Sequence, residues 1–250
     1  MNPFDISGKT ILVTGASSGL GRHFVSMLAG HGASVVAAAR RRDLLDELVE
    51  DVAAAGGSAQ AVRLDVNDSE SIRTAFDEAG PVDVVINNAG VSNSKPLLDQ
   101  IDAEIDQILD TNLRGALRVA TEAARRMREE DGNGSIVNIA LILGLRQAGH
   151  VTPYAMSKAG IIQMTKQLAL ELARYSIRVN AIAPGYFETE LNRDFLSGPA
   201  GDALIRRIPQ RRAGRPDDLD GPLLLLASDA SAYMTGTILV VDGGHLVSSL

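Results

Sequence analysis

Short runs of β-branched and small apolar residues alternate with longer stretches of helical periodicity, and this alternation constrains the fold more than any other feature of the chain. Strands that are separated by helices are joined by crossover connections, which make the strands parallel. The runs are nearly continuous in apolar character, as expected when helices cover both faces of the sheet. The sequence therefore predicts an α/β, doubly wound fold with a seven-stranded parallel sheet, whose strands lie at residues 10–14, 34–39, 61–65, 82–87, 135–140, 178–183 and 237–241.

One domain is expected to span residues 1–250, because the 250 residues with 45% hydrophobic content suffice for a single sizeable core. Asn67 or Ser69 is expected to cap the helix that runs through Phe76, and Pro216 to start the last helix. Residues 185–215 mix glycine, proline and charge in a long irregular segment, so we expect a substrate lid there.

The composition argues against several classes of function. The chain has 24 Lys and Arg against 31 Asp and Glu, a formal net charge of -7, so no nucleic-acid partner is expected. It has no cysteine, which excludes disulfides and thiolate chemistry and fits a cytoplasmic location. No apolar run approaches the ~20 residues that cross a bilayer, and no targeting segment is evident, so no membrane partner is expected. We expect no metal site.

A glycine-rich turn, Thr14-Gly15-Ala16-Ser17-Ser18-Gly19-Leu20-Gly21, stands between the first expected strand and helix. Glycines there allow a tight turn and a close approach of the backbone to a pyrophosphate, which the N–H groups of the helix N-terminus then face. The spacing departs from G-x-G-x-x-G, and the extra serines can reach phosphate or ribose. This context predicts a bound dinucleotide.

The second expected strand ends in Ala38-Ala39-Arg40-Arg41, without the carboxylate that binds the adenosine ribose of NAD. Arg40 can meet a 2′-phosphate through charge-assisted hydrogen bonds, with Arg41 beside it. The sequence therefore favours NADP(H) over NAD(H), although arginines at the start of a helix are often only solvated.

Tyr154 and Lys158 are four residues apart, so they share one face of a helix. A neighbouring ammonium favours the phenolate and brings a phenol toward the range in which it exchanges protons with a substrate oxygen. On its own this spacing is common by chance, so it indicates a catalytic pair only together with the other motifs of the chain.

Taken in order, these motifs resemble the short-chain dehydrogenase/reductase family (SDR), through Thr14 to Gly21, Asn87-Asn88-Ala89-Gly90, Asn112, Tyr154 with Lys158, Pro184-Gly185 and the ending Val241-Asp242-Gly243-Gly244. The resemblance covers nearly the whole chain and implies a Rossmann-type fold. It implies that Tyr154 is the general acid/base, that Lys158 binds the nicotinamide ribose and lowers the pKa of Tyr154, and that Asn112 holds a water in the proton relay. The cofactor-binding residues that we expect are Gly15, Ser17, Ser18, Gly19, Leu20, Gly21, Arg40, Arg41, Asp65, Val66, Asn88, Ala89, Gly90, Tyr154, Lys158, Pro184, Gly185, Phe187 and Thr189.

Leu141 departs from the family pattern, because it stands where a serine usually donates a hydrogen bond to the substrate carbonyl. The loss of one such donor typically costs about 10²- to 10³-fold in rate. His150 or Gln147 in the following loop can replace that donor, or Leu141 can shape the pocket for another substrate. The expected substrate pocket is mostly apolar and consists of Leu141, Leu143, His150, Tyr186, Leu191 and Phe195.

These features predict an NADP(H)-dependent carbonyl reductase or alcohol dehydrogenase, acting on a small-molecule ketone or secondary alcohol. Two alternatives remain open: reduction of C=N or C=C bonds, and a nucleotide-binding protein with impaired turnover. The resemblance also implies a homotetramer formed through the helices around residues 102–128 and 152–174.

Overall fold

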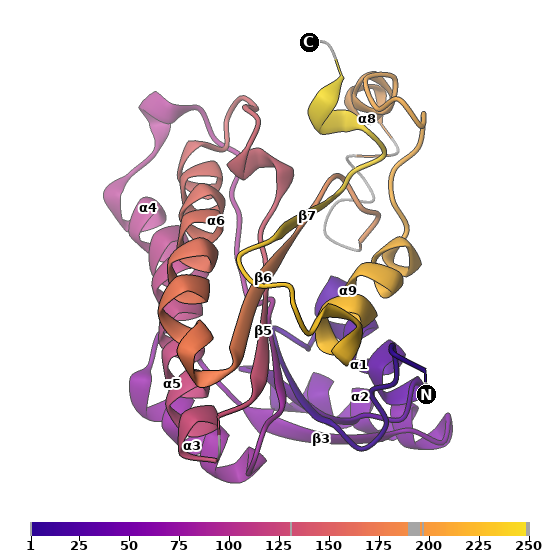
Figure 1. Cartoon of the computed structure of the whole chain (residues 1–250). Helices are drawn as coiled ribbons and strands as arrows, with labels where there is room; N and C mark the ends of the chain where they lie inside the picture. The colour runs from indigo at the N-terminus through magenta and orange to yellow at the C-terminus, as the bar shows by residue number, and fades with distance from the viewer. Residues whose placement is uncertain (1, 131, 190–195, 197, 249–250) are drawn as a thin grey trace.

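The computed structural model describes residues 2–130, 132–189, 196 and 198–248. Its centre is a seven-stranded parallel sheet in the order β3-β2-β1-β4-β5-β6-β7, which confirms the predicted doubly wound fold (Figure 1). The strands are β1 (Thr10–Thr14), β2 (Ser34–Ala39), β3 (Ser58–Arg63), β4 (Val84–Asn87), β5 (Gly134–Ile139), β6 (Ile177–Pro184) and β7 (Ile238–Val241).

Helices cover both faces of the sheet. One buried cluster packs α1 (Gly19–Gly30), α2 (Arg42–Ala54) and α9 (Asp220–Ala227) against it. The other packs α3 (Ser69–Ala79), α5 (Ala116–Glu129) and α6 (Thr152–Leu172) on the opposite face. The short helices α4 (Asp102–Leu109) and α8 (Pro199–Ile205) lie toward the upper end in Figure 1. This layering explains why the central strands are apolar on both faces.

The strand order reverses beside β1, which pairs with β2 on one side and β4 on the other. Open α/β sheets bind ligands at such a switch point, outside the carboxyl ends of the strands. The glycine-rich turn follows β1 at this place, and the Asn88-Ala89-Gly90 segment follows β4. The topology therefore brings two of the predicted cofactor segments together.

Two edge features differ from the sequence expectation. β3 begins at Ser58 rather than at residue 61, because residues 58–61 pair in register with Ser34 to Ala37 of β2. Burial alternates along β3, and β7 is only half-buried, so these two strands are not covered on both faces as the central strands are. An edge strand with one wet face tolerates polar residues, and the continuous apolar pattern misses it.

The cap of α3 is neither Asn67 nor Ser69 but Asp68, whose carboxylate accepts a hydrogen bond from the Glu70 amide at 2.9 Å. All three residue types are good caps, and the chain turns into the helix at Asp68. At the other end of the chain, Pro216 starts a 3₁₀ turn, Pro216–Leu219, which leads into α9.

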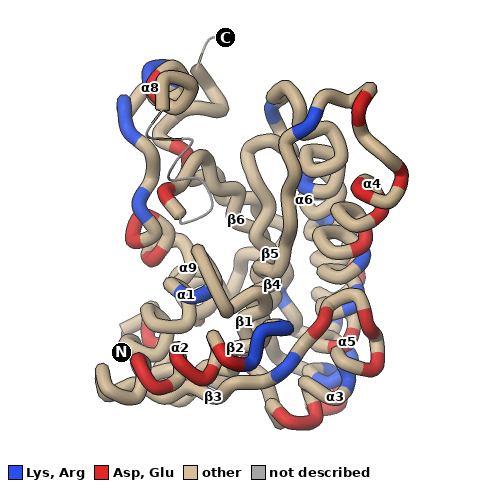
Figure 2. The backbone as a smooth tube through the Cα atoms, turned by 180° about the vertical axis from the view of Figure 1, so that it is seen from behind, with Lys and Arg blue, Asp and Glu red and all other residues tan. Residues whose placement is uncertain are grey.

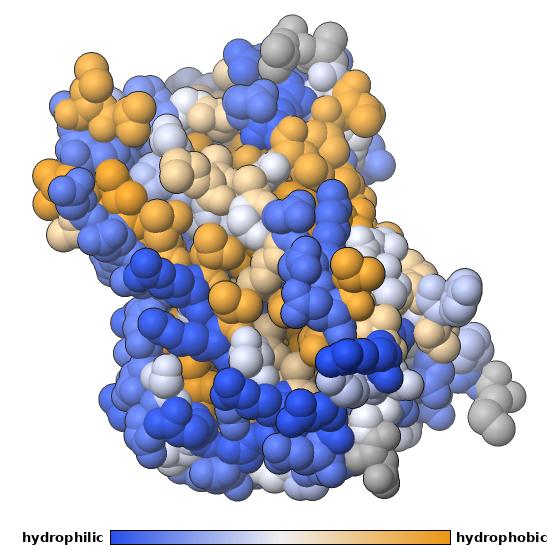
Figure 3. All heavy atoms as spheres, turned by 60° about the vertical axis from the view of Figure 1, so that its left-hand side comes forward, coloured by the Kyte–Doolittle hydropathy of each residue, from blue (hydrophilic) through white to orange (hydrophobic). Residues whose placement is uncertain are grey.

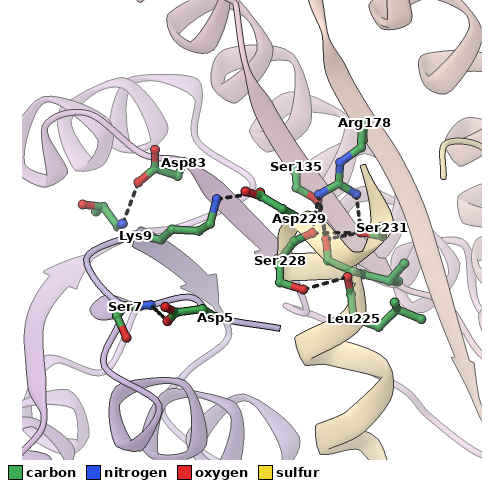
Figure 4. A network of polar contacts seen from close by, with 12 residues as sticks. Asp5, Ser7, Lys9, Asp83, Ser135, Arg178, Leu225, Ser228, Asp229 and Ser231 are labelled. Atoms are coloured by element: carbon green, nitrogen blue, oxygen red, sulfur yellow. Dashed lines mark hydrogen bonds and ion pairs between the residues drawn. The ribbon is translucent and has the colours of Figure 1, made fainter. Parts of the chain in front are cut away.

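A polar network closes the amino end of the sheet, opposite the switch point (Figure 4). Lys9 Nζ pairs with Asp229 at 3.1 Å, and Arg178 donates to Ser231 Oγ at 2.7 Å. Ser135 Oγ donates to the carbonyl of Leu226 at 2.8 Å. These contacts fasten the strand starts to the segment after α9. Lys9, Ser135, Arg178 and Asp229 also line a hollow of about 670 Å³.

Candidate active site

In the glycine turn after β1, Gly15 and Gly21 lie against neighbouring backbone, whereas Gly19 does not. Gly15 has φ +68°, and a Cβ there would lie 2.8 Å from Cα of Ala89. A Cβ on Gly21 would collide with the carbonyl of Gly15, whereas one on Gly19 would meet nothing nearer than Thr189 Cγ2 at 4.0 Å. The backbone at Gly19 is therefore open to a ligand, while Leu20 beside it packs against the core.

The N-terminus of α1 suits a phosphate. Its N-cap residue, Ser18, makes no side-chain capping hydrogen bond, so its hydroxyl does not compete for the N–H groups of the first turn. Such N–H groups, with the helix dipole, bind anions. Arg41 Nη2 donates to Ser17 Oγ at 2.9 Å and to Ser18 Oγ at 3.0 Å, which brings a positive charge to the turn.

Arg40 is exposed, and within the described residues it forms no hydrogen bond or ion pair. Arg41, at the start of α2, is the arginine that folds back over the glycine turn, whereas sequence reasoning had given Arg40 the leading role. Figure 2 shows the arginine run as a blue segment at the carboxyl end of β2. The run contains no acidic residue, so it would present positive charge to the adenosine ribose of a bound dinucleotide.

The segment after β4 is anchored to the turn by Thr14. Its Oγ1 accepts hydrogen bonds from the amides of Asn88 and Ala89, both at 3.0 Å. The Asn88 amide group donates to the carbonyl of Thr14 at 3.0 Å, so two strand ends are tied together. Asn87 serves the sheet instead, since its side chain donates to Ala116 and Asn138.

Asp65 and Val66, expected among the cofactor-binding residues, follow β3. The carboxylate of Asp65 is half-buried and accepts from the Asn67 amide at 3.0 Å. Val66 is 6% exposed, and a Cβ on Gly115 would lie 2.7 Å from its Cγ2. Val66 thus packs against the start of α5, and Asp65 beside it is more exposed.

Lys158, expected to act with Tyr154, is buried in the first half of α6. Its Nζ donates to the carbonyl of Ile139 at 2.8 Å, so the last residue of β5 fixes the ammonium. The same Nζ lies 5.7 Å from the centroid of the Tyr154 ring. The pairing that the four-residue spacing predicted is confirmed in the structure.

Burial governs the ionisation of both groups. It raises the pKa of Tyr154 to about 12, with a smaller contribution from Tyr186. It also lowers the pKa of Lys158 to about 8. The resemblance implied a lowered pKa for Tyr154, but in this structure burial outweighs the neighbouring ammonium, which is already bound to a carbonyl. Both shifts favour the neutral form, as loss of solvation does.

Asn112 lies in a π-helical segment, Asp110–Gly115, between α4 and α5. Its side chain accepts from the Val91 amide at 2.7 Å and donates to the Val91 carbonyl at 2.9 Å and to Ser157 Oγ at 3.1 Å. Ser157 in turn donates to the carbonyl of Tyr154 at 2.7 Å. Asn112 thus links the segment after Gly90 to the helix that carries Tyr154. Local π geometry often marks functional sites.

The segment after β6 packs differently along its length. A Cβ on Gly185 would lie 2.8 Å from Asp242, so the chain passes close to the end of β7 after Pro184. Phe187 is 5% exposed and belongs to the core, whereas Thr189 faces the glycine turn at Gly19. Thr189 is therefore the better placed of the two for a cofactor.

The expected substrate residues are only partly gathered. Leu141 is half-buried with an extended backbone just after β5, and Leu143 is 9% exposed. Tyr186 is half-buried and close enough to Tyr154 to affect its pKa. His150 is exposed with φ +64°, and its carbonyl accepts from the Lys95 amide. Leu191 and Phe195 lie outside the described residues.

Two residues at this end escaped sequence reasoning. His245, in the turn His245–Val247 after β7, stacks on Tyr186 with ring centroids 5.7 Å apart. Arg146 donates to the carbonyl of His245 and to Ser248 Oγ. The only signal for them was position, since one follows the Gly243-Gly244 ending and the other lies in the loop after Leu141.

Comparisons with known proteins agree with this geometry. A family model described as Enoyl-(Acyl carrier protein) reductase matches residues 15–245. The 3-oxoacyl-(acyl-carrier-protein) reductase of Thermotoga maritima is 36% identical, covering 97% of this chain and 99% of that protein. The crystal structure of a short-chain type dehydrogenase/reductase from Mycobacterium marinum has a TM-score of 0.92 at 39% identity, covering 98% of each chain.

A gluconate 5-dehydrogenase from Burkholderia cenocepacia J2315, crystallised with NADP and tartrate, has a TM-score of 0.95 at 34% identity and covers 99% of each chain. No helix in the described part of the chain is long and apolar enough to span a membrane. With relatives at this identity over nearly their full length, and with Lys158 paired with Tyr154 in a chain that carries the glycine turn after β1, the chain belongs to the short-chain dehydrogenase/reductase family and is an NAD(P)-dependent oxidoreductase of carbonyl and alcohol substrates.

Proposed function

We propose that this chain is an NADP(H)-dependent oxidoreductase that interconverts a ketone and a secondary alcohol, with Tyr154 as its general acid/base. The observation that carries the proposal is the contact set of Lys158, which is bound to the Ile139 carbonyl and lies 5.7 Å from the Tyr154 ring. When bound, NADP(H) supplies or accepts the hydride. The residues fit such a cofactor, because the backbone at Gly19 is open and Arg41 lies over the serines of the turn.

Tyr154 holds the proton that the substrate oxygen needs. Burial raises the pKa of Tyr154 to about 12, so the phenol is protonated at neutral pH and ready to donate to a developing alkoxide. Donation leaves a phenolate, and in the oxidative direction Tyr154 starts from this phenolate, which accepts the proton of the alcohol. The Ile139 carbonyl holds Lys158 Nζ 5.7 Å from the Tyr154 ring centroid, and Asn112 fixes α6 against the Val91 backbone.

With Leu141 the site lacks one hydrogen-bond donor to the substrate carbonyl, because a leucine side chain cannot donate a hydrogen bond. The hypothesis that His150 replaces the serine receives no support from its exposed position. We therefore expect either slow reduction of simple ketones or a substrate whose own polar groups bind elsewhere in the pocket.

The test compares the chain with its Leu141→Ser variant in single-turnover NADPH oxidation with a panel of ketones. Tyr154→Phe is the control that removes the proton donor. A rise of about 10²- to 10³-fold in Leu141→Ser identifies a carbonyl reductase that lacks one donor. Equal or faster turnover with Leu141 means that the leucine shapes the pocket. No turnover by either protein with any ketone contradicts the proposal, and turnover of imines or enones alone favours C=N or C=C reduction.

The proposed assembly is a homotetramer built through α4, α5 and α6. Large apolar side chains are exposed on and near these helices, including Leu117 at 42%, Met156 at 55% and Leu170 at 75%. Figure 3, which brings this side forward, shows apolar side chains gathered among hydrophilic ones. Such surfaces mark association sites. Light scattering after gel filtration tests this, and a monomer at micromolar concentration refutes it.

Residues 185–215, which include α8, are proposed as the substrate lid.

A further inference from the structure

His245 carries a buried nitrogen that lacks a hydrogen-bond partner. Its side chain is 4% exposed, and its Nδ1 is the one buried side-chain nitrogen or oxygen without a partner in the part of the chain that the structure describes. A buried polar atom without a partner costs about 1–3 kcal/mol, so native proteins rarely keep one without a use. This nitrogen therefore indicates a missing ligand atom.

The turn that carries His245 is held in place by hydrogen bonds on both sides. The Asp242 carboxylate accepts from the amides of Gly244, at 2.8 Å, and Leu246, at 2.5 Å. Arg146 Nη1 donates to the His245 carbonyl and, at 3.0 Å, to Ser248 Oγ. The imidazole is therefore fixed by contacts that do not use its own nitrogens.

The imidazole lies next to the reacting end of the site. Its ring stacks on Tyr186 at 5.7 Å, with the ring planes inclined by 40°. Tyr186 follows Gly185 in the segment after β6 and is close enough to Tyr154 to raise its pKa. Tyr186 thus contacts His245 and lies near enough to Tyr154 to act on it, so the imidazole is placed toward the far end of a substrate held at Tyr154.

Positive charge prevails around this nitrogen. Arg146 and Arg207 both act on His245, against Asp242 alone, whose carboxylate is already bound to two backbone amides. Arg146 also acts on Tyr186. Only Nη1 of Arg146 is used, since Nε and Nη2 donate to none of the described residues, and the guanidinium of Arg207 has no hydrogen bond or ion pair with them either. Planar guanidinium donors of this kind recognise carboxylates.

We propose that His245 and Arg146 form an anion-binding end of the substrate pocket, and that the substrate is a hydroxy or oxo compound bearing a carboxylate. The guanidinium pairs with the carboxylate, and His245 hydrogen-bonds an oxygen of the same end of the molecule. This inference rests on the proposed function and narrows its substrate class. It also explains how a site with Leu141 can orient a substrate, because binding at the far end replaces the missing contact at the carbonyl.

The test uses D-gluconate and sorbitol as probes, which differ in having a carboxylate or a neutral CH₂OH at one end. The protein is saturated with NADPH, so that neither alcohol can be oxidised. Only four histidines are present, so their ring ¹⁵N signals can be assigned with His245→Gln and the other single variants. We expect gluconate to shift the His245 signal saturably and to leave His23 in place, with sorbitol at least 10-fold weaker.

Two arginine variants separate charge from folding. Arg146→Gln is expected to weaken gluconate binding by 10-fold or more. Arg207→Gln changes an exposed side chain that has no hydrogen bond to the described residues, so it is expected to keep the fold and to weaken binding about two- to fivefold. Arg22→Gln, whose partner is Asp51 on α2, is the matched control and should bind as the parent does.

The outcomes distinguish this inference from the proposed function. If 100 mM gluconate leaves the His245 signal unmoved, or if sorbitol shifts it as strongly, the anion-binding end is refuted, whatever the ketone assay shows. If gluconate shifts His245 but no ketone is reduced with NADPH, the anion site stands and the proposed reaction fails.

Discussion

Thr14 should contribute more to stability than its size suggests, because its hydroxyl satisfies two backbone amides at the switch point. It is 0% exposed and accepts from Asn88 N and Ala89 N, both at 3.0 Å. Thr14→Val keeps the shape and leaves both N–H groups without that partner. An unsatisfied group costs about 1–3 kcal/mol when buried, and these two amides are part-buried, so we expect a loss of about 2–3 kcal/mol in the free energy of unfolding.

The assay is urea denaturation and thermal unfolding at fixed protein concentration. At about 2–4 °C per kcal/mol for a chain of this size, the midpoint should fall by at least about 4 °C. Thr14→Ser keeps the hydroxyl and should recover most of the loss. Thr121→Val, which removes an exposed hydroxyl bound to the Leu117 carbonyl, should change stability by less than about 0.5 kcal/mol. If Thr14→Val is no less stable than Thr14→Ser, the two amides do not depend on the hydroxyl and the reasoning is wrong.

Three further predictions concern the site. Burial lowers the pKa of Lys158 to about 8, so between about pH 8 and about pH 10.5 the unfolded chain binds more protons than the folded one. Over this pH range the free energy of unfolding, relative to that of Lys158→Met, should therefore rise by up to about 3 kcal/mol. Urea denaturation of both proteins across the range tests this, and an equal pH dependence of the two would contradict it. Arg41→Gln should weaken NADPH binding about 10- to 100-fold and NADH binding little, with Arg40→Gln the milder variant; fluorescence titration with both cofactors decides. Tyr154→Phe should lower kcat/KM by about 10²- to 10⁴-fold with an unchanged Kd for NADPH, and a retained rate would remove Tyr154 from proton transfer.

The sequence was sufficient for the central strands and for the placement of Lys158 beside Tyr154. Apolar runs buried on both faces placed β1 and β2 at their observed bounds, and the four-residue spacing brought Lys158 to Tyr154. It was insufficient for β3, because a strand at the sheet edge alternates and begins in polar residues. It was also insufficient for the cap of α3, where three neighbouring residues can all act as caps.

Contacts between distant segments were beyond sequence reasoning. The choice between Arg40 and Arg41 depends on how the chain turns into α2, and only the backbone shows that Arg41 faces Ser17. The contact of Arg146 with His245 joins positions 99 residues apart, and nothing local to either residue indicates it. The same holds for the binding of Lys158 to Ile139, which depends on how α6 packs against the end of β5.

The two ends of the sheet show why these distant contacts matter for function. At the amino end, Arg178 donates to Ser231 and to the carbonyls of Leu226 and Ser228, so its charge is fully engaged and serves stability. At the carboxyl end, Arg146 uses one nitrogen to hold a turn, and His245 keeps Nδ1 without a partner. Because satisfied groups stabilise a fold and unsatisfied ones cost stability, the carboxyl end has kept a cost that the rest of the molecule must offset. A bound substrate with an oxygen at this end would remove that cost, and this is the physical reason for proposing that His245 contacts the substrate.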